Sequence, residues 1–183
     1  IVTHITQSRW THMGIVFKEQ GQLWVFEASP GRVRKVSLSE FTRDAYARRL
    51  GYNSRSVVYI MPPRTPFADA ELAAMRSFAK RQVGRRYSIK GILRDRPVEG
   101  TNCAQFVAAT LQQSGRIRFP HTFDQTPEKV LDRSKHLYAE LIHVTAPSNH
   151  SDHPWLEATG RTFQDTREWL KWTTWEMYHY WRD

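Results

Sequence analysis

Cysteine is almost missing from this chain of 183 residues, which contains only Cys103. A single thiol excludes a disulfide within the chain and a metal site built from several cysteines. Long apolar runs are missing as well, and no segment has the length of a membrane-spanning helix. The chain starts at Ile1 without a methionine or a charged and apolar leader, so we expect a trimmed domain or a processed product, secreted or delivered to a target cell envelope.

The position of Cys103 in the sequence favours a reactive thiol. It lies in Thr101-Asn102-Cys103-Ala104-Gln105, where a helix is expected to begin. A helix N-terminus lowers the pKa of a thiol and offers free backbone N–H groups to a developing oxyanion. The alternative is a small buried residue on a core helix. The two interpretations differ in whether the chain also supplies a base.

Acidic residues are outnumbered, because 27 Lys and Arg against 18 Asp and Glu give a net charge of +9 at pH 7. This charge favours an anionic partner such as a phospholipid surface, an acidic polymer or nucleic acid. Arginine clusters at 48–49, 85–86 and 94–96 suit phosphate and carboxylate groups, although a solvated surface has such clusters too. A non-catalytic module that binds nucleic acid or protein is one alternative, but dispersed basic residues and the lack of a recognised motif make nucleic acid the less expected partner.

The apolar pattern predicts one α+β domain over residues 1–146. Apolar, β-prone segments at 13–17 and 23–28 flank a turn and predict a hairpin. The remaining expected elements are helices at 37–50, at 69–83, from Cys103 to near Gly115 and from Thr126 onward, with strands at 57–61 and 137–144. Strands on both sides of a helix-borne cysteine predict an antiparallel sheet packed on helices that lie on one side.

Residues 147–183 differ in character and are interpreted as a linker and an aromatic C-terminal helical extension. The predicted helix, at 162–182, contains Trp169, Trp172, Trp175 and Trp181. Tryptophan and tyrosine favour the membrane interface, and the same spacing also suits a helix that docks on its own core or on a partner protein. His150, Asp152 and His153 are metal-ligand types, but they crowd a proline-flanked loop without a third anchored histidine. We therefore predict no metal and no cofactor.

A base for Cys103 is offered by His12, which is expected to begin the first strand of the hairpin. A cysteine hydrolase needs an imidazole beside the thiol and a polar group that fixes the tautomer of that imidazole. Glu27 ends the second strand, and a turn near Gln20 sets the two strand ends side by side. Gly14 is expected to leave space beside the imidazole. Taken alone, a strand-end histidine is more often a packed or surface residue, and His4, His121 and His143 are the competing histidines.

Five motifs occur in a characteristic order in the chain. They are Ser8-Arg9-Trp10-Thr11-His12-Met13-Gly14-Ile15-Val16, Val25-Phe26-Glu27-Ala28, Gly84-Arg85-Arg86-Tyr87, Asn102-Cys103-Ala104-Gln105-Phe106-Val107 and Gln125-Thr126-Pro127. In this order the chain resembles the circularly permuted branch of the NlpC-type papain-like cysteine hydrolases. That branch includes YiiX/YaeF-like bacterial proteins and lecithin–retinol acyltransferase-like enzymes. The resemblance covers roughly residues 1–144 and implies a permuted papain-like fold.

The resemblance implies a role for each matching residue. Cys103 is the expected nucleophile, His12 the general base and then acid, and Glu27 the group that orients His12. The backbone N–H of Cys103 is expected to contribute to the oxyanion hole. Tyr87 and Asn102 are the candidate oxyanion or substrate contacts, although Tyr87 also suits a place in the core. The chain departs from the family where Ala104 replaces the usual serine and where no aspartate follows Tyr87.

These observations predict a cysteine-dependent hydrolase or acyltransferase that forms a thioester acyl-enzyme. Charge and the tryptophan-rich segment favour membrane phospholipid as substrate, with peripheral membrane contact. The alternative of the same fold is a peptidoglycan amidase or endopeptidase, because an acidic muropeptide suits the arginines almost as well. An antibacterial effector role is a further expectation, with an inhibitor or immunity protein as the partner at the catalytic cleft or at the aromatic C-terminal helix.

Overall fold

The computed structural model describes residues 10, 12–47, 58–94 and 96–144. The predicted linker, the C-terminal helix with its tryptophans, and the domain boundary at 146 lie outside these residues. No helix within the described ranges is both long enough and apolar enough to cross a membrane.

The predicted hairpin is confirmed and forms the first two strands, β1 (Gly14–Glu19) and β2 (Gln22–Ala28). Gln20 and Gly21 connect them, with φ values of 50° and 81°, as a two-residue turn with positive φ at both positions requires. Glycine adopts such a φ without steric cost. The register pairs Gly14 with Glu27, so this turn determines which residues face each other at the opposite end of the hairpin.

A third strand that the sequence pattern did not reveal, β3 (Val33–Ser37), extends the sheet in the order β1-β2-β3. Arg34 and Lys35 are adjacent within it, which obscures the strict alternation expected of a strand. Helix α2 (Leu38–Ala47) follows directly, and the Ser37 hydroxyl caps it by accepting the Glu40 N–H at 3.1 Å. The expected helix start is thereby confirmed.

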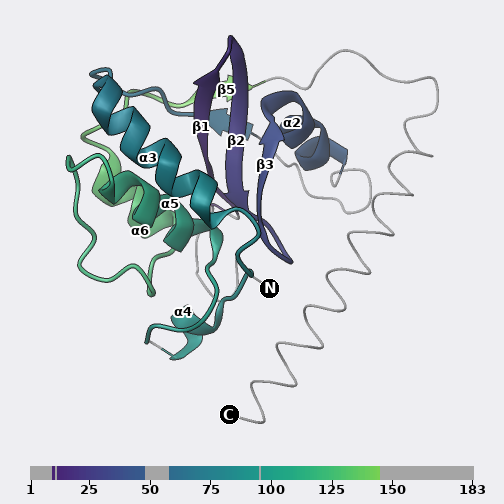
Figure 1. Cartoon of the computed structure of the whole chain (residues 1–183), viewed down its shortest axis with the longest axis vertical. Helices are drawn as coiled ribbons and strands as arrows, with labels where there is room; N and C mark the ends of the chain where they lie inside the picture. Colours follow the sequence, from purple (N-terminus) through teal and green to yellow (C-terminus); the bar gives the residue numbers. More distant parts are fainter. Residues whose placement is uncertain (1–9, 11, 48–57, 95, 145–183) are drawn as a thin grey trace.

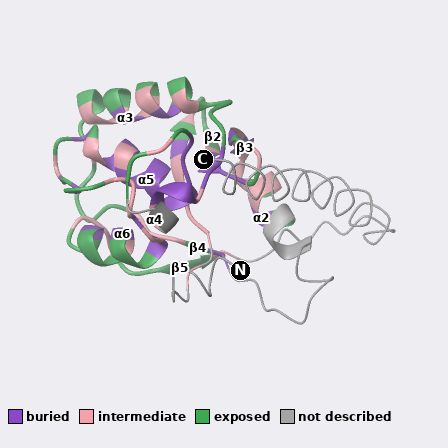
Figure 2. Ribbon diagram, turned by 90° about the horizontal axis from the view of Figure 1, so that it is seen from below, coloured by how far each residue is buried: buried purple, intermediate pink, exposed green. Residues whose placement is uncertain are grey.

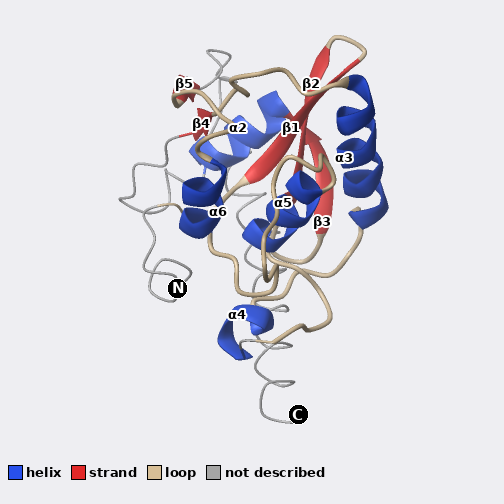
Figure 3. Cartoon of the chain, turned by 90° about the vertical axis from the view of Figure 1, so that its left-hand side faces the viewer, coloured by secondary structure: helices blue, strands red, loops and turns tan. Residues whose placement is uncertain are grey.

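The helices cover both faces of the sheet (Figures 1 and 3). Helices α3 (Asp69–Gln82), α5 (Cys103–Gln112) and α6 (Pro127–Ser134) lie on one side, and α2 packs against β2 and β3 on the other. The expectation that the helices lie on one side is therefore wrong. It failed because β3 was not recognised: α2 follows this edge strand directly and packs on the face of the sheet opposite α5.

Helix α5 occupies the centre of the molecule, as Figure 2 shows by its burial, whereas α3 and α6 expose their outer surfaces. The core between α5 and the sheet contains Phe26, Phe106, Met75, Ala28 and Ala104, each at most 1% exposed. Because α5 is apolar on nearly every side, neighbouring elements fix its N-terminus tightly against the start of β1. The catalytic candidate Cys103 is the first residue of this helix.

The second, two-stranded sheet is formed by β4 (Val58–Ile60) and β5 (Ile142–Val144). The strand predicted at 137–144 is limited to its last three residues, and Tyr138 makes only an isolated bridge to Pro63. A short helix that was not predicted, α4 (Lys90–Arg94), precedes α5. The helix predicted from Thr126 is confirmed as α6, with Pro127 at its first position.

Close packing at the start of β1 requires glycine at position 14. A Cβ atom there would lie 2.9 Å from Val25 Cγ1 and 3.0 Å from the Phe26 carbonyl oxygen. The reason for this glycine is therefore the approach of β1 to β2, and not space beside the imidazole as the sequence suggested. At the other end of β1, Glu19 contacts Lys35 at 2.6 Å and Lys80 of α3 at 3.1 Å.

Candidate active site

The N-terminus of α5 is built by reciprocal capping around Cys103. Asn102 Oδ1 accepts the Gln105 backbone N–H at 2.9 Å, and Gln105 Oε1 accepts the Asn102 N–H at 3.0 Å. This capping box fixes the first turn of the helix and leaves the N–H groups at its start free to face the nucleophile. Cys103 itself is only 3% exposed.

The Cys103 thiol contacts three donors from two distant parts of the chain. The His12 side chain bonds to it, and so do the backbone N–H groups of Met13 and Ala104. Burial raises the pKa of the thiol, but the hydrogen bond and charge of His12 and these two N–H groups outweigh burial and lower the pKa. The site therefore stabilises a thiolate.

His12 lies two residues before β1 rather than within it, on the same side of the hairpin as Glu27. Its Nε2 atom is hydrogen-bonded to Glu27 Oε2, which leaves Nδ1 for the thiol. The ring also stacks on Phe41 of α2, with 6.2 Å between ring centroids. Three elements thus hold the imidazole in one orientation.

Glu27 is held in turn by Arg34, its cross-strand partner on β3. Arg34 Nε and Nη2 lie 2.8 Å and 2.7 Å from Glu27 Oε1. The guanidinium therefore holds Oε1, and the His12 imidazole holds Oε2. Burial raises the pKa of Glu27, which is 2% exposed, but the hydrogen bond and charge of His12 and the Arg34 guanidinium outweigh burial and lower it. Glu27 is therefore ionised at neutral pH.

The pKa of His12 moves in the opposite direction. Burial lowers it, but hydrogen bonds to Cys103 and Glu27 and the negative charge of both partners raise the pKa to about 10. A thiol with a lowered pKa beside an imidazole with a raised pKa exists at neutral pH as a thiolate–imidazolium pair. This arrangement provides a nucleophile and a proton donor to the leaving group in one contact.

The structure brings together Cys103, His12 and Glu27, the three residues expected to be catalytic. Tyr87 is 5% exposed and belongs to the hydrophobic core, the other position that the sequence left open for it. Asn102 caps the helix, and its Nδ2 atom is buried with no hydrogen-bond partner in the described part of the chain. The oxyanion role of both residues stays a prediction.

None of the competing histidines that the structure describes replaces His12. His143 lies on β5 and is exposed, with its ring 5.6 Å from that of Tyr59. His121 packs on Phe123 in the loop before α6. His4 and the loop at 150–153 lie outside the described residues. No group of three or more His, Cys, Asp or Glu within the described ranges is arranged to hold a metal ion.

Sequence analysis missed Arg34 and the backbone N–H of Met13. Arg34 lies on the unrecognised strand β3, and only the β2–β3 register places it opposite Glu27. The contact of Met13 depends on how closely β1 approaches α5, which no local pattern encodes. The basic residue at the position opposite Glu27 was the one available signal, but it required β3 to be recognised first.

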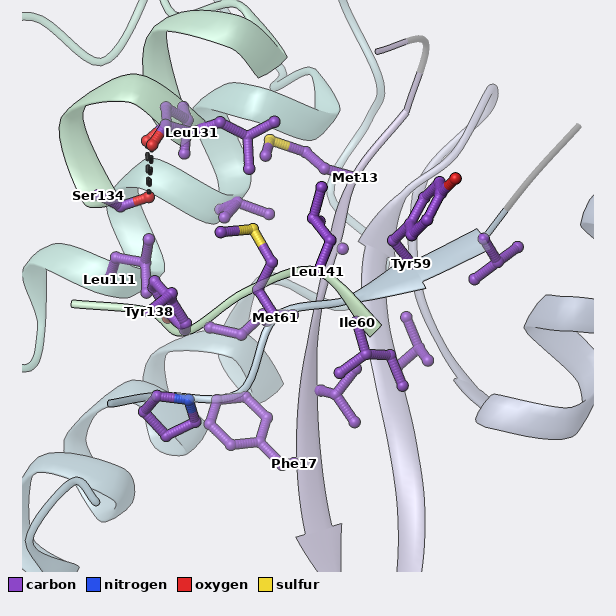
Figure 4. A pocket seen from close by; sticks show the side chains of 18 of the residues that line it. Met13, Phe17, Tyr59, Ile60, Met61, Leu111, Leu131, Ser134, Tyr138 and Leu141 are labelled. Atoms are coloured by element: carbon purple, nitrogen blue, oxygen red, sulfur yellow. Dashed lines mark hydrogen bonds between the residues drawn. The ribbon is translucent and has the colours of Figure 1, made fainter. Parts of the chain in front are cut away.

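An apolar cavity of about 310 Å³ reaches His12. Figure 4 shows side chains that line it. His12 and Met13, which both bond to the thiol, belong to its lining, although Cys103 itself does not. The cavity lies between the sheets and the helices, and its wall includes Phe41, Tyr59 and Leu111. Among the described residues that line it, none is Asp, Glu, Lys or Arg.

Comparison with known proteins identifies a family whose model matches most of the chain. The model of a family described as permuted papain-like amidase enzymes, YaeF/YiiX, C92 family, matches residues 1–159. No curated protein and no solved structure matches the chain. The matched range includes Cys103, His12 and Glu27.

The thiolate–imidazolium pair predicts a shifted pH profile for alkylation of Cys103 by iodoacetamide. The rate should reach half its plateau below the ordinary pKa of a thiol, because His12 and two N–H groups lower the pKa of Cys103. In His12→Gln the pH at half-maximal alkylation should move up, because burial raises the pKa of the Cys103 thiol and the lowering effect of His12 is lost. Turnover should fall by about 10²–10⁴-fold in the same variant. A midpoint that is equal in both proteins would contradict the pair.

Turnover of the intact enzyme should also fall at alkaline pH, near the His12 pKa of about 10, as the imidazolium loses its proton. A profile of kcat/KM that continues to rise through this range would show that His12 isn't the proton donor.

Arg34 should act on catalysis through Glu27. Arg34→Met is expected to lower kcat about tenfold and leave KM nearly unchanged, because a hydrogen bond to a charged group contributes about 1.5–3 kcal/mol and water recovers part of it at this partly exposed site. Its control is Arg34→Lys, which keeps the charge but not the two-pronged contact and should be intermediate. Unchanged kcat in Arg34→Met, with the alkylation midpoint of Cys103 also unchanged, would exclude this role.

Proposed function

This chain belongs to the permuted papain-like amidase family of the YaeF/YiiX type (C92), and from that premise we propose that it releases acyl groups from membrane lipids. Its family makes it a cysteine hydrolase of the amidase class in the broad sense. The narrower proposal concerns the carbonyl that Cys103 attacks. The observation that supports lipid is the apolar cavity reaching the catalytic histidine.

The first half-reaction forms a thioester. The Cys103 thiolate attacks the acyl carbonyl carbon, and the carbonyl oxygen becomes an oxyanion. The His12 imidazolium then gives its proton to the leaving alcohol oxygen, the carbon–oxygen bond breaks, and the acyl group stays on sulfur. His12 is neutral at the end of this step, and the charge of Glu27 stabilises the imidazolium at its start.

The second half-reaction removes the acyl group. A water molecule gives a proton to neutral His12 as its oxygen attacks the thioester carbonyl, and the Cys103 thiolate leaves. The thiolate–imidazolium pair is restored and a fatty acid departs. An alcohol or amine in place of water gives an acyltransferase by the same steps, which keeps both activities within this proposal.

The oxyanion requires donors that are not already engaged. The backbone N–H of Cys103 is one, as the family resemblance implies. Asn102 Nδ2 is a second, because its carbonyl Oδ1 is occupied by the cap while Nδ2 is buried and has no hydrogen-bond partner among the described residues. A buried amide donor without a partner is costly, and this cost is removed when an oxyanion accepts from it.

Lipid is favoured over peptide by the lining of the cavity. A muropeptide carries amides and carboxylates, which need hydrogen bonds when buried. The cavity beside His12 offers mainly aliphatic and aromatic side chains, the lining that an acyl chain requires. Several basic residues that contribute to the net positive charge are paired with acids, as Arg116 is with Glu71 at 2.6 Å.

The second candidate function is hydrolysis of an amide bond in a cell-wall peptide. It is favoured by the description of the matching family, which names an amidase. The same triad performs this reaction with an amine as the leaving group. The effector role and an inhibitor partner at the catalytic cleft rest on the sequence and remain part of the proposal.

Incubation with vesicles of mixed zwitterionic and anionic phospholipids should release fatty acid. Intact-mass measurement should show an acyl adduct on Cys103, and Cys103→Ala protein should give neither product nor adduct. Cleavage of cell-wall fragments without release of fatty acid would replace the lipid proposal by the amidase. Full activity of Cys103→Ala on either substrate would exclude the cysteine mechanism altogether.

The role of Asn102 can be separated from its capping role by two substitutions. Asn102→Ser keeps a cap acceptor but removes the N–H donor, so we expect kcat to fall by about 10²–10³-fold with little change in stability. Asn102→Ala removes the cap as well and should also lower the free energy of unfolding by about 0.5–2 kcal/mol. Wild-type kcat in Asn102→Ser would assign the oxyanion hole to other groups.

A further inference from the structure

We propose that the apolar cavity is an acyl-chain site that holds about ten carbons of the chain, so that carbons beyond this number add no further binding. This inference rests on the proposed function and adds the size of the acyl group. It is carried by the direction of the cavity from the nucleophile, by its length, by its volume and by the nature of its far end.

The direction follows from one face of α5. Cys103, Val107 and Leu111 are spaced four residues apart, so they form a stripe along the helix. Val107 and Leu111 line the cavity, and the first member of the stripe is the nucleophile. A chain attached to Cys103 Sγ therefore has a continuous apolar path along the helix that carries the sulfur.

The length of this path can be estimated from α5 and from β1. Leu111 is eight residues beyond Cys103, which corresponds to about 12 Å along a helix. On the opposite wall Met13 and Phe17 both line the cavity, and four residues of a strand span about 13 Å. An extended chain advances about 1.2 Å per bond, because three backbone bonds of a polypeptide span about 3.6 Å, so about ten bonds cover this path.

The volume leads to a similar limit by an independent route. An engineered protein cavity of about 150 Å³ holds one benzene molecule, which has six carbons. The cavity beside His12 has about 310 Å³, roughly twice that space. It therefore accommodates about twelve carbons at the same density, and longer chains must leave part of their length outside.

The far end of the cavity is lined by uncharged side chains. Leu111, Leu131, Ser134 and Tyr138 gather on one side of it in Figure 4. The Ser134 hydroxyl donates to the Val130 carbonyl at 2.7 Å, so its polar atom is already engaged. Burial raises the pKa of Tyr138 to about 12, which keeps its hydroxyl neutral. This end suits a terminal methyl group.

The experiment measures kcat/KM on a series of p-nitrophenyl esters from four to sixteen carbons, with intact mass to detect the thioester. For the native chain we expect kcat/KM to rise about fourfold per methylene up to about ten carbons and then to stop rising. Leu131→Trp, which narrows the far end, should move the limit to shorter chains. Leu131→Ala, which deepens that end, should move it to longer ones and doesn't overpack the core.

The matched control is Ile142→Trp, a tryptophan at a position that is 56% exposed and does not line the cavity. It should keep the native chain-length profile. Equal kcat/KM from four to sixteen carbons, or one profile for the native, Leu131→Trp and Leu131→Ala proteins, would overturn the chain-length proposal and leave the acyl hydrolase intact. Failure of every ester and of phospholipid to acylate Cys103 would overturn both proposals.

Discussion

A row of four alternating charges governs the architecture of this site. Arg34, Glu27, His12 and Cys103 carry positive, negative, positive and negative charge in sequence, and each contacts the next. Glu27 and Cys103 are buried and His12 and Arg34 are partly exposed, so an isolated charge would be costly at the buried positions, and the net charge of zero together with satisfied hydrogen bonds offsets that cost. Removing one member leaves its neighbour as an uncompensated charge, which couples the role of each residue to all others.

This row depends on the register of the three-stranded sheet. The two-residue turn at Gln20 and Gly21 pairs Gly14 with Glu27, and the next connection pairs Glu27 with Arg34. A slip of one residue would move Glu27 to the opposite face of the sheet, away from both partners. The hairpin geometry is thus part of the catalytic chemistry, because it decides whether a carboxylate meets the imidazole at all.

Local signals in the sequence were enough for the hairpin and the helix starts, whereas the three catalytic candidates needed the order of five motifs along the chain. The capping residues Ser37 and Thr126 and the asparagine before Cys103 each mark a helix start within a few residues. Features that combine distant segments were not predictable in this way. Arg34 required a strand without clear alternation, and the cavity is formed by side chains from both sheets and four helices. In the sequence, lipid was favoured by the net positive charge and the tryptophan-rich segment. In the structure, lipid is supported by the apolar cavity instead.

The ion cluster around Glu19 has a consequence for the proposed acyl site. It ties the distal end of β1 to α3 through Lys80, while the proximal end is tied to α5 through His12 and Met13. The strand between these two anchors is one wall of the cavity. Because β1 is anchored at both ends, the proposed acyl site would be preformed and would not have to reorganise when a ligand binds.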